Sequence, residues 1–289
     1  MMKRFLAATL LAAAPSLAQA QTPPSPPQPA PARPPVLALP LSFTPPGWNL
    51  TLGAAAITSP AWQGSRDQAL SLFPNIRLAY SDVLFVSVSE GVGWAALRKD
   101  GWRAGPLIKP RFGRNESNGG SPFLIAGGST ALVGMGNVKF AGEAGGFVEK
   151  QFGPRRAWRA RGELRQGFGG HRGLVADASL AYRTPIGRAI ATVGPNVTAG
   201  GSQFVQTYYG VDARQSQRTG LARYDAKGGI VSYGLGASLL RPLDRRSAIT
   251  LFTNLDRLSG PAAHSPLVRE RGRRTQFTLG IGYGRRFKL

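Results

Sequence analysis

The side chains best suited to catalysis in this chain are its two histidines, His171 and His264. Nucleophilic catalysis needs a base beside a hydroxyl group, and His264 is followed directly by Ser265. This pair raises the hypothesis of a lipid-modifying hydrolase embedded in a membrane barrel. The simpler interpretation, which we favour, is that both histidines are ordinary loop residues, so we assign no catalytic residue and expect a protein that is not an enzyme.

Metal and cofactor sites have weaker candidates still. The chain has no cysteine and only two histidines, and its acidic residues are scattered without the spacing of metal ligands. The glycine-rich residues 280–284 lack the strand-to-helix context of a phosphate-binding loop. We therefore expect no metal and no cofactor.

One glycine-rich constellation stands out between residues 165 and 173. Four glycines around a histidine indicate a tight turn or a close approach of the backbone. We interpret it as a glycine-dependent hairpin, with a contact loop for a partner as the alternative. The candidate residues are Arg165, Gln166, Gly167, Gly169, Gly170, His171 and Gly173.

The chain is strongly basic, with a formal net charge of +22. Basic proteins often bind nucleic acid, but these arginines are dispersed along the sequence and form no single stripe. Arginine also pairs well with phosphate through its planar fork. We therefore expect contacts with lipid head groups and lipopolysaccharide, or a basic lumen, and no nucleic-acid partner.

The N-terminal segment has the three parts of an export signal. Lys3 and Arg4 precede a short apolar run, and a small-x-small cleavage motif ends at Ala20. The run is too short to span a bilayer. We expect a cleaved signal peptide over residues 1–20 and a proline- and alanine-rich periplasmic tether over residues 21–46.

The remaining residues, 47–289, alternate between apolar and small or polar side chains. In the last segment Phe277, Leu279, Ile281 and Tyr283 share one face, and glycines dominate the other. A transmembrane barrel strand shows such an apolar face to lipid and its small or polar face to a wet lumen. Because an unpaired backbone amide is costly in hydrocarbon, the sheet must close on itself. The pattern predicts an all-β, antiparallel transmembrane β-barrel of the outer membrane.

The number of strands is about twelve, with ten as the alternative. Short turns on one rim and long loops on the other are typical of such barrels. With twelve strands and both ends in the periplasm, the long 114–134 connection falls on the periplasmic rim, and dropping the doubtful 203–210 strand leaves an odd count. The expected strands are 49–57, 69–80, 83–94, 102–113, 138–152, 156–168, 172–183, 187–200, 203–210, 229–241, 246–257 and 274–287.

Seven short elements, in order from about Trp48 to the end, resemble the MltA-interacting protein (MipA) and OmpV family of outer-membrane proteins. Each is weak alone, and together they are specific. The elements are residues 62–65, 73–76, 132–138, 165–173, 206–211 with the following 215–226, 265–268 and 276–277. In the fifth, Tyr208, Tyr209, Gly210, Tyr224 and Asp225 form a loop typical of the family.

The resemblance implies a barrel located in the outer membrane with no established catalytic residues. It further implies a scaffold for peptidoglycan-remodelling enzymes, with a murein transglycosylase and a murein synthase as partners. The alternatives are a passive, anion-preferring pore, suggested by the arginine-rich strand faces, and the lipid-modifying hydrolase. Neither the oligomeric state nor the openness of the lumen follows from the sequence.

Overall fold

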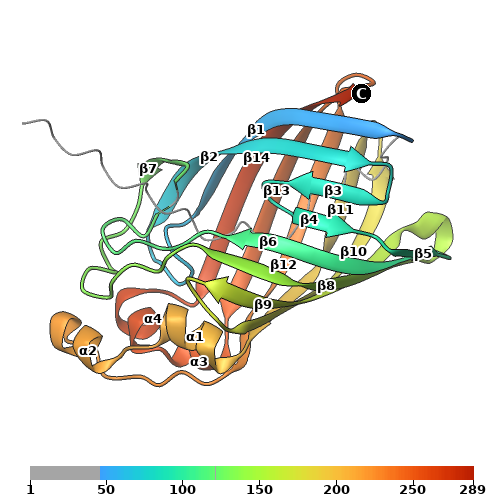
Figure 1. Ribbon diagram of the computed structural model, residues 1–289. Helices are drawn as coiled ribbons and strands as arrows, with labels where there is room; N and C mark the ends of the chain where they lie inside the picture. The colour runs from blue at the N-terminus through green and yellow to red at the C-terminus, as the bar shows by residue number, and fades with distance from the viewer. Residues whose placement is uncertain (1–45, 121) are drawn as a thin grey trace, which may run out of the picture.

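The computed structural model describes residues 46–120 and 122–289, so the predicted signal peptide and nearly all of the predicted tether lie outside the described residues. Strands dominate the described part, and four short α-helices lie near one end (Figure 1). The strands are β1 (Trp48–Pro60), β2 (Gln68–Tyr80), β3 (Leu84–Ser87), β4 (Gly91–Trp94), β5 (Leu97–Lys99), β6 (Trp102–Arg111), β7 (Leu124–Gly127), β8 (Ala141–Phe152), β9 (Trp158–Gly169), β10 (Leu174–Ile186), β11 (Ala189–Gly200), β12 (Gly229–Pro242), β13 (Ser247–Leu258) and β14 (Thr275–Lys288). The helices are α1 (Ser202–Tyr209), α2 (Ala213–Thr219), α3 (Gly260–His264) and α4 (Pro266–Arg271), with a 3₁₀ turn, η1, at Pro154–Arg156.

The sheet closes into a barrel because β1 pairs with both β2 and β14. The ring runs β1-β2-β3-β4-β6-β8-β9-β10-β11-β12-β13-β14 and is antiparallel throughout. The remaining strands, β5 and β7, pair with β6 and β2 outside this ring. The prediction of a closed barrel of twelve strands is confirmed. Closure pairs each strand of the ring with two neighbours, as hydrocarbon requires, and the short strands β5 and β7 each pair on one side only.

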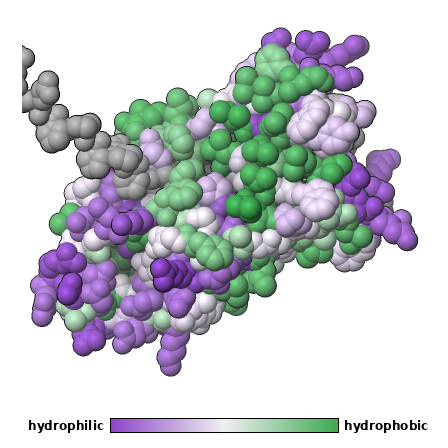
Figure 2. Space-filling view, in the orientation of Figure 1, coloured by the Kyte–Doolittle hydropathy of each residue, from purple (hydrophilic) through white to green (hydrophobic). Residues whose placement is uncertain are grey.

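The outer surface of the barrel is apolar along its middle, as Figure 2 shows for one face. In β14 the side chains of Phe277, Leu279, Ile281 and Tyr283 are exposed, and the alternate residues from Gln276 to Gly284 are buried toward the lumen. This is the alternation expected of a lipid-facing strand. Hydrophilic side chains gather at the two ends of the same view (Figure 2). In the described part of the chain, no helix has the length and hydropathy of a membrane span.

Aromatic side chains form a girdle at the end of the barrel that carries the termini. All are at least about one-third exposed, and several are in contact, such as Trp48 with Tyr80 at 5.1 Å and Trp158 with Tyr182 at 4.9 Å between ring centroids. Such belts sit at membrane interfaces. The girdle includes the seven aromatics that the sequence places at strand ends: Trp48, Trp94, Trp102, Phe152, Trp158, Tyr182 and Phe287.

The expected single strand 83–94 is wrong, because these residues fold into a short hairpin, β3 and β4. The turn between them lies at residues 88–90, and Gly91 takes a positive φ of 82°. The hairpin covers only the part of β2 near the termini, where Leu84 is opposite Tyr80. At the other end of β2, β7 takes over the pairing. Glu90, a misfit on the apolar face of the expected strand, pairs instead with Arg77 at 2.9 Å.

This extra reversal also corrects the position of the 114–134 connection. It follows β6, which starts at the rim of the termini and ends at the opposite rim. The connection therefore lies with the other long loops, and not on the periplasmic rim. The short turns 81–83, 95–101, 153–157, 187–188 and 243–246 all lie at the rim of the termini, which we call the turn rim.

The expected strand 203–210 is also wrong, because the segment is helix α1. Phe204, Val205, Tyr208 and Tyr209 are its buried residues, a spacing of one helical turn. Two errors in strand assignment thus cancelled: one predicted strand is two, and another is a helix.

The long loops fold together over the rim opposite the termini into what we call the cap, residues 61–67, 112–140, 170–173, 201–228 and 259–274 (Figure 1). The cap has its own apolar core, which includes Trp62, Leu132, Met135, Tyr209 and Leu267. Polar bonds tie its segments together as well. Arg271 donates to the carbonyl oxygens of Ala131 and Thr219, and Gln215 donates to that of Met135. The cap is therefore a packed layer and not a set of independent loops.

Candidate functional site

Charged side chains line one side of the lumen below the cap. The residues that alternate inward along β6, β8 and β9 carry charges of both signs, and each strand supplies partners to the others. Lys109 on β6 donates to Glu163 on β9 at 2.6 Å, although β8 lies between them. Arg161 pairs with Glu163 at 2.9 Å and with Glu149 on β8 at 3.1 Å. The ion pairs therefore link adjacent strands, and the Lys109–Glu163 pair also links two strands that are not adjacent in the sheet.

Arg165 is the centre of this network. The Arg165 side chain is fully buried and pairs with three carboxylates, those of Glu143, Glu163 and Asp177. The distances to Glu143 and Asp177 are 2.8 and 2.5 Å. Thr198 also donates to Asp177, at 2.6 Å. A guanidinium has five N–H donors in a fixed fork, so one arginine can hold three acids at once.

His171 closes the network from the cap. It is buried, its Nδ1 accepts from the backbone N–H of Gly173 at 3.3 Å, and its Nε2 lies 3.1 Å from Glu143. Because Nδ1 accepts, the proton of a neutral ring sits on Nε2 and is donated to Glu143. A Cβ on Gly167 would lie 2.1 Å from the His171 ring, so only glycine leaves room for it. Arg165, Gly167, His171 and Gly173 of the glycine-rich motif thus meet at one place, inside the molecule.

The rest of that motif lies at the end of β9. Gln166 donates to the carbonyl oxygens of Gly167 and Arg172. Gly169 ends the strand, and a Cβ on Gly170 would lie only 1.8 Å from the carbonyl oxygen of Lys139. The motif therefore packs β9 against residues 139–141, and the side chains of Arg165 and His171 point into the lumen.

The loop typical of the family lies in the cap. Tyr208 lines the lumen, and Tyr209 is fully buried with a hydroxyl that has no hydrogen-bond partner among the described residues. Burial raises the pKa of Tyr209, so its hydroxyl stays protonated. Gly210 ends α1, the Tyr224 hydroxyl donates to the carbonyl oxygen of Pro261 at 2.9 Å, and Asp225 is exposed. These residues act as cap contacts, and Tyr208 alone among them reaches the lumen.

The pair proposed for hydrolysis is not arranged as a nucleophile and base. Ser265 is fully buried, and its hydroxyl donates to the carbonyl oxygen of Tyr209 at 2.6 Å. The His264 side chain is exposed at the end of α3. No hydrogen bond joins the two side chains in the described part of the chain. Residues 46–289, apart from 121, also contain no group of three acidic or histidine side chains that could hold a metal ion.

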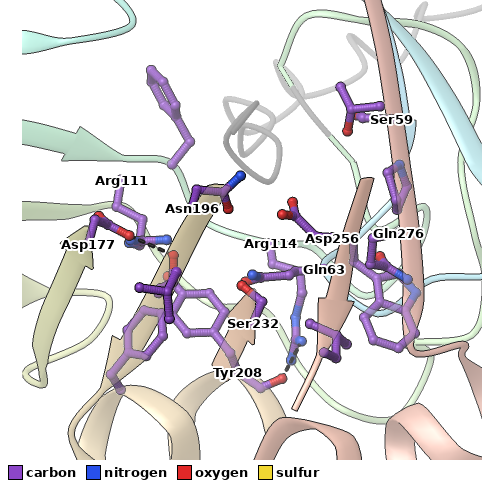
Figure 3. Close-up of a pocket in the computed structure, with 18 of the residues that line it drawn as sticks. Ser59, Gln63, Arg111, Arg114, Asp177, Asn196, Tyr208, Ser232, Asp256 and Gln276 are labelled. Atoms are coloured by element: carbon purple, nitrogen blue, oxygen red, sulfur yellow. Dashed lines mark hydrogen bonds between the residues drawn. The ribbon is translucent and has the colours of Figure 1, made fainter. Parts of the chain in front are cut away.

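A cavity of about 140 Å³ with a mixed polar and apolar lining lies between the charged network and the cap (Figure 3). Residues from distant parts of the sequence line it, including Arg114 and Tyr208 of the cap and Asp177 of β10. Others come from the opposite side, such as Asp256 of β13 and Gln276 of β14. The lining combines guanidinium, carboxylate and amide groups with aromatic and aliphatic ones, which suits a small ligand that carries both polar and apolar parts.

The lumen below this cavity is filled with side chains. Phe85, Leu107 and Phe147 pack together inside the barrel on one side, and Ile57 and Phe252 do so on the other. A second hollow of about 40 Å³, lined by Thr51, Arg77 and Glu90 among others, shares no lining residue with the first. The two hollows are therefore separate spaces within one barrel.

Sequence reasoning missed Arg114 and Asp256, which line the cavity and lie outside the recognised motifs, and it gave Gln276 of the element 276–277 no role in a site. Gln276 accepts from the backbone N–H of Gly64 at 2.8 Å and so joins β14 to the cap. The inward alternation of β13 and β14 places Asp256 and Gln276 in the lumen. For Arg114, directly after β6, the sequence holds no such signal, because only the fold of the cap turns it inward.

Known structures with similar folds are outer-membrane proteins. They include an outer-membrane channel from Pseudomonas putida F1 (13% identity, 84% of this chain and 96% of that one, TM-score 0.43), the NanC porin (10%, 84% and 100%, 0.36) and an anion-selective porin from Comamonas acidovorans (10%, 83% and 98%, 0.29). No curated protein matches the chain.

A family model named for the MltA-interacting protein MipA matches residues 52–287. The match spans nearly the whole described barrel, cap included. Most of the motifs that carry the resemblance gather in the cap or directly below it, as with residues 62–65, 132–138, 165–173 and 265–268. The chain belongs to the MipA family and is an outer-membrane β-barrel.

Proposed function

We propose that this protein is a non-enzymatic scaffold in the outer membrane that docks peptidoglycan-remodelling enzymes, a murein transglycosylase and a murein synthase. The observation that carries the proposal is the family match over residues 52–287, since the family is named for its interaction with such an enzyme. The absence of an assembled nucleophile and base at His264 and Ser265 is consistent with a binding role.

The docking surface of this scaffold is the turn rim. Barrels of this class keep short turns and chain termini on the periplasmic side, where the murein layer lies. Seven basic side chains are exposed in these turns, none of them in an ion pair within the described part of the chain, against three acidic ones. The basic residues are Arg98, Lys99, Arg155, Arg156, Arg188, Arg245 and Arg246. Such a rim attracts an acidic partner surface.

The three carboxylates of the turn rim offset only part of the charge of its seven basic side chains. Asp244 is occupied with the backbone N–H groups of Arg246 and Ser247, which donate to it at 2.6 and 2.8 Å. These bonds lower the pKa of Asp244, so it serves as the cap of its own turn. Residues 21–46, predicted to be a periplasmic tether, are the second proposed contact for the partner.

A pull-down from detergent-solubilised membranes tests the scaffold. Tagged full-length protein should recover a murein hydrolase. Reversing Arg155, Arg156 and Arg188 to glutamate should release it. Reversing the exposed cap residues Arg214, Arg218 and Arg223 is the matched control and should leave recovery unchanged. A wild-type pull-down without any murein enzyme would refute the scaffold, and equal losses in both triple variants would refute the turn rim as its surface.

The outward-facing cap is the proposed contact with lipopolysaccharide. Arg214, Arg218, Arg223 and Lys227 are exposed on it, and arginine binds phosphate bidentately. The same three arginine reversals should therefore weaken binding of purified lipopolysaccharide to the protein in detergent. Unchanged binding would contradict this contact.

The alternative, a passive anion-preferring pore, was suggested by the arginines on the inner strand faces. Arg161 and Arg165 are engaged with carboxylates, and aromatic side chains pack the lumen between the two hollows. Planar-bilayer recordings of the purified protein should therefore be silent. A steady anion-selective conductance would favour the pore over the closed scaffold.

A further inference from the structure

Arg114 is a buried cation that forms no ion pair with a carboxylate of the described residues. The residue is 6% exposed, and its Nη1 donates to the carbonyl oxygen of Tyr208 at 2.8 Å (Figure 3). Its Nε is buried and has no hydrogen-bond partner among the described residues. The backbone of Arg114 is fixed by paired bonds with Val138 at 2.7 and 2.8 Å. The guanidinium is thus held firmly in the cavity wall with one edge unused.

The other cations that line the same cavity all have carboxylate partners. Arg111 pairs with Glu143, and Arg161 pairs with Glu149 and Glu163. Among the described residues no carboxylate pairs with Arg114, and the carboxylates of the charged network are already bound to Lys109 and to Arg165. The unmatched positive charge of the cavity is therefore located at one residue.

Burying a charge without a partner is costly, so such groups usually serve a ligand or a metal. Burial lowers the pKa of Arg114 below its ordinary value, which reflects this lack of compensation. A second donor without a partner lines the same space: the indole N–H of Trp62 is buried and unbonded in the described part of the chain. Two orphaned donors in one cavity indicate a ligand rich in acceptors.

We propose that the cavity binds a small carboxylate, with its two oxygens on the free edge of the Arg114 guanidinium. The fork of an arginine matches a carboxylate bidentately. A cavity of about 140 Å³ takes a solute of about six heavy atoms, since an engineered cavity of about 150 Å³ in another protein holds benzene. The site is independent of the scaffold proposed above, which uses the turn rim.

The opposite side of the cavity distinguishes two kinds of carboxylate. Asp256 has a buried carboxylate oxygen, Oδ1, that lacks a hydrogen-bond partner among the described residues. An ammonium group on the solute would satisfy it, as in an α-amino acid. A simple carboxylate such as propionate would use Arg114 alone. The two solutes share the carboxylate chemistry and differ in their need for Asp256.

Titration calorimetry of the purified full-length protein in detergent tests this site. The probes are propionate and D-alanine, with chloride and phosphate as comparison anions at constant ionic strength. Saturable binding of at least one carboxylate is expected. Arg114→Gln should weaken it by about tenfold or more, the loss expected for a charge-assisted bond. The control Arg269→Gln, at an exposed arginine on α4, should bind as the wild type does.

Folding of each variant is checked by its shift on an unboiled gel, and Arg114→Lys, which keeps the charge, should retain part of the affinity if Arg114→Gln does not fold. Asp256→Asn should weaken D-alanine but not propionate if the ligand is an amino acid, and neither if it is a simple acid. The proposal fails if the folded wild type binds no carboxylate, if chloride or phosphate binds as tightly, or if Arg114→Gln leaves the affinity unchanged.

Discussion

The lumen has two walls of different chemistry. The charged wall comprises the inward side chains of β6, β8, β9 and β10, where Arg165 and Glu143 are fully buried. What we call the neutral wall comprises those of β13, β14 and β1, where hydroxyl, amide, glycine and apolar groups replace charges between the two ends, apart from Asp256 of β13 beside the cavity. Both walls keep a strict alternation, so the outer faces look alike to lipid. The difference is how each wall fills the lumen.

The side chains of the charged wall depend on one another for charge compensation. Removing one member leaves buried partners uncompensated, and Arg165 has three of them. The side chains of the neutral wall depend instead on steric fit with their neighbours. Gly280 on β14 lies beside Phe252 on β13, where a Cβ would come 2.2 Å from the ring. Mutations should therefore act through charge on one wall and through volume on the other.

Arg165→Leu should have the largest effect. It leaves Glu143, Glu163 and Asp177 without their shared cation, and breaking a buried ion pair costs about 3–5 kcal/mol. The free energy of unfolding, from urea titration of the protein folded into lipid vesicles, should fall by that amount. Arg165→Lys keeps the charge but loses the planar guanidinium, so its free energy of unfolding should fall by less. A loss below about 1 kcal/mol for Arg165→Leu would remove the distinction between the walls.

The sequence predicts which side chains face the lumen on each wall, but it does not predict the contacts between them. Period-two alternation predicts that Arg161, Glu163 and Arg165 lie on the inner face of β9. It also predicts that the glycines of β14 lie on the inner face of that strand, and both predictions are confirmed. The ion pairs could not be predicted in the same way. Lys109 reaches Glu163 across β8, so their contact depends on the register of three strands. The face on which a side chain lies follows from its position along its own strand, whereas its ion-pair partner depends on how several strands align.

The two wrong strand assignments have local causes. Val86 and Val92 are both exposed on the outer face, so β3 and β4 read as one strand across their turn. The turn signal, Ser89-Glu90-Gly91, was present but weak. Residues 203–210 are rich in β-branched and aromatic types, which favour strands. The cap overrides this preference by burying Phe204 and Tyr208 one helical turn apart.

Gly280→Val should have an intermediate effect that depends on volume alone. The added side chain collides with Phe252, and overpacking of this kind costs about 1–3 kcal/mol. The second change Phe252→Ala should restore part of the loss, because it vacates the space that valine needs. Urea unfolding of both single variants and the double variant measures this coupling. Strict additivity of the two losses would show that the ring and the glycine are not a matched pair.

Thr250→Val should have the smallest effect of the three. Thr250 is buried on the neutral wall beside the smaller hollow, and valine keeps its shape while removing the hydroxyl. Because no carboxylate depends on that hydroxyl, the free energy of unfolding should change by less than about 0.5 kcal/mol. The matched change is Thr198→Val on the neighbouring strand β11, which removes the bond to Asp177 of the charged wall and should cost about 1–3 kcal/mol. Equal losses at the two threonines would mean that the walls do not differ in how they hold their polar groups.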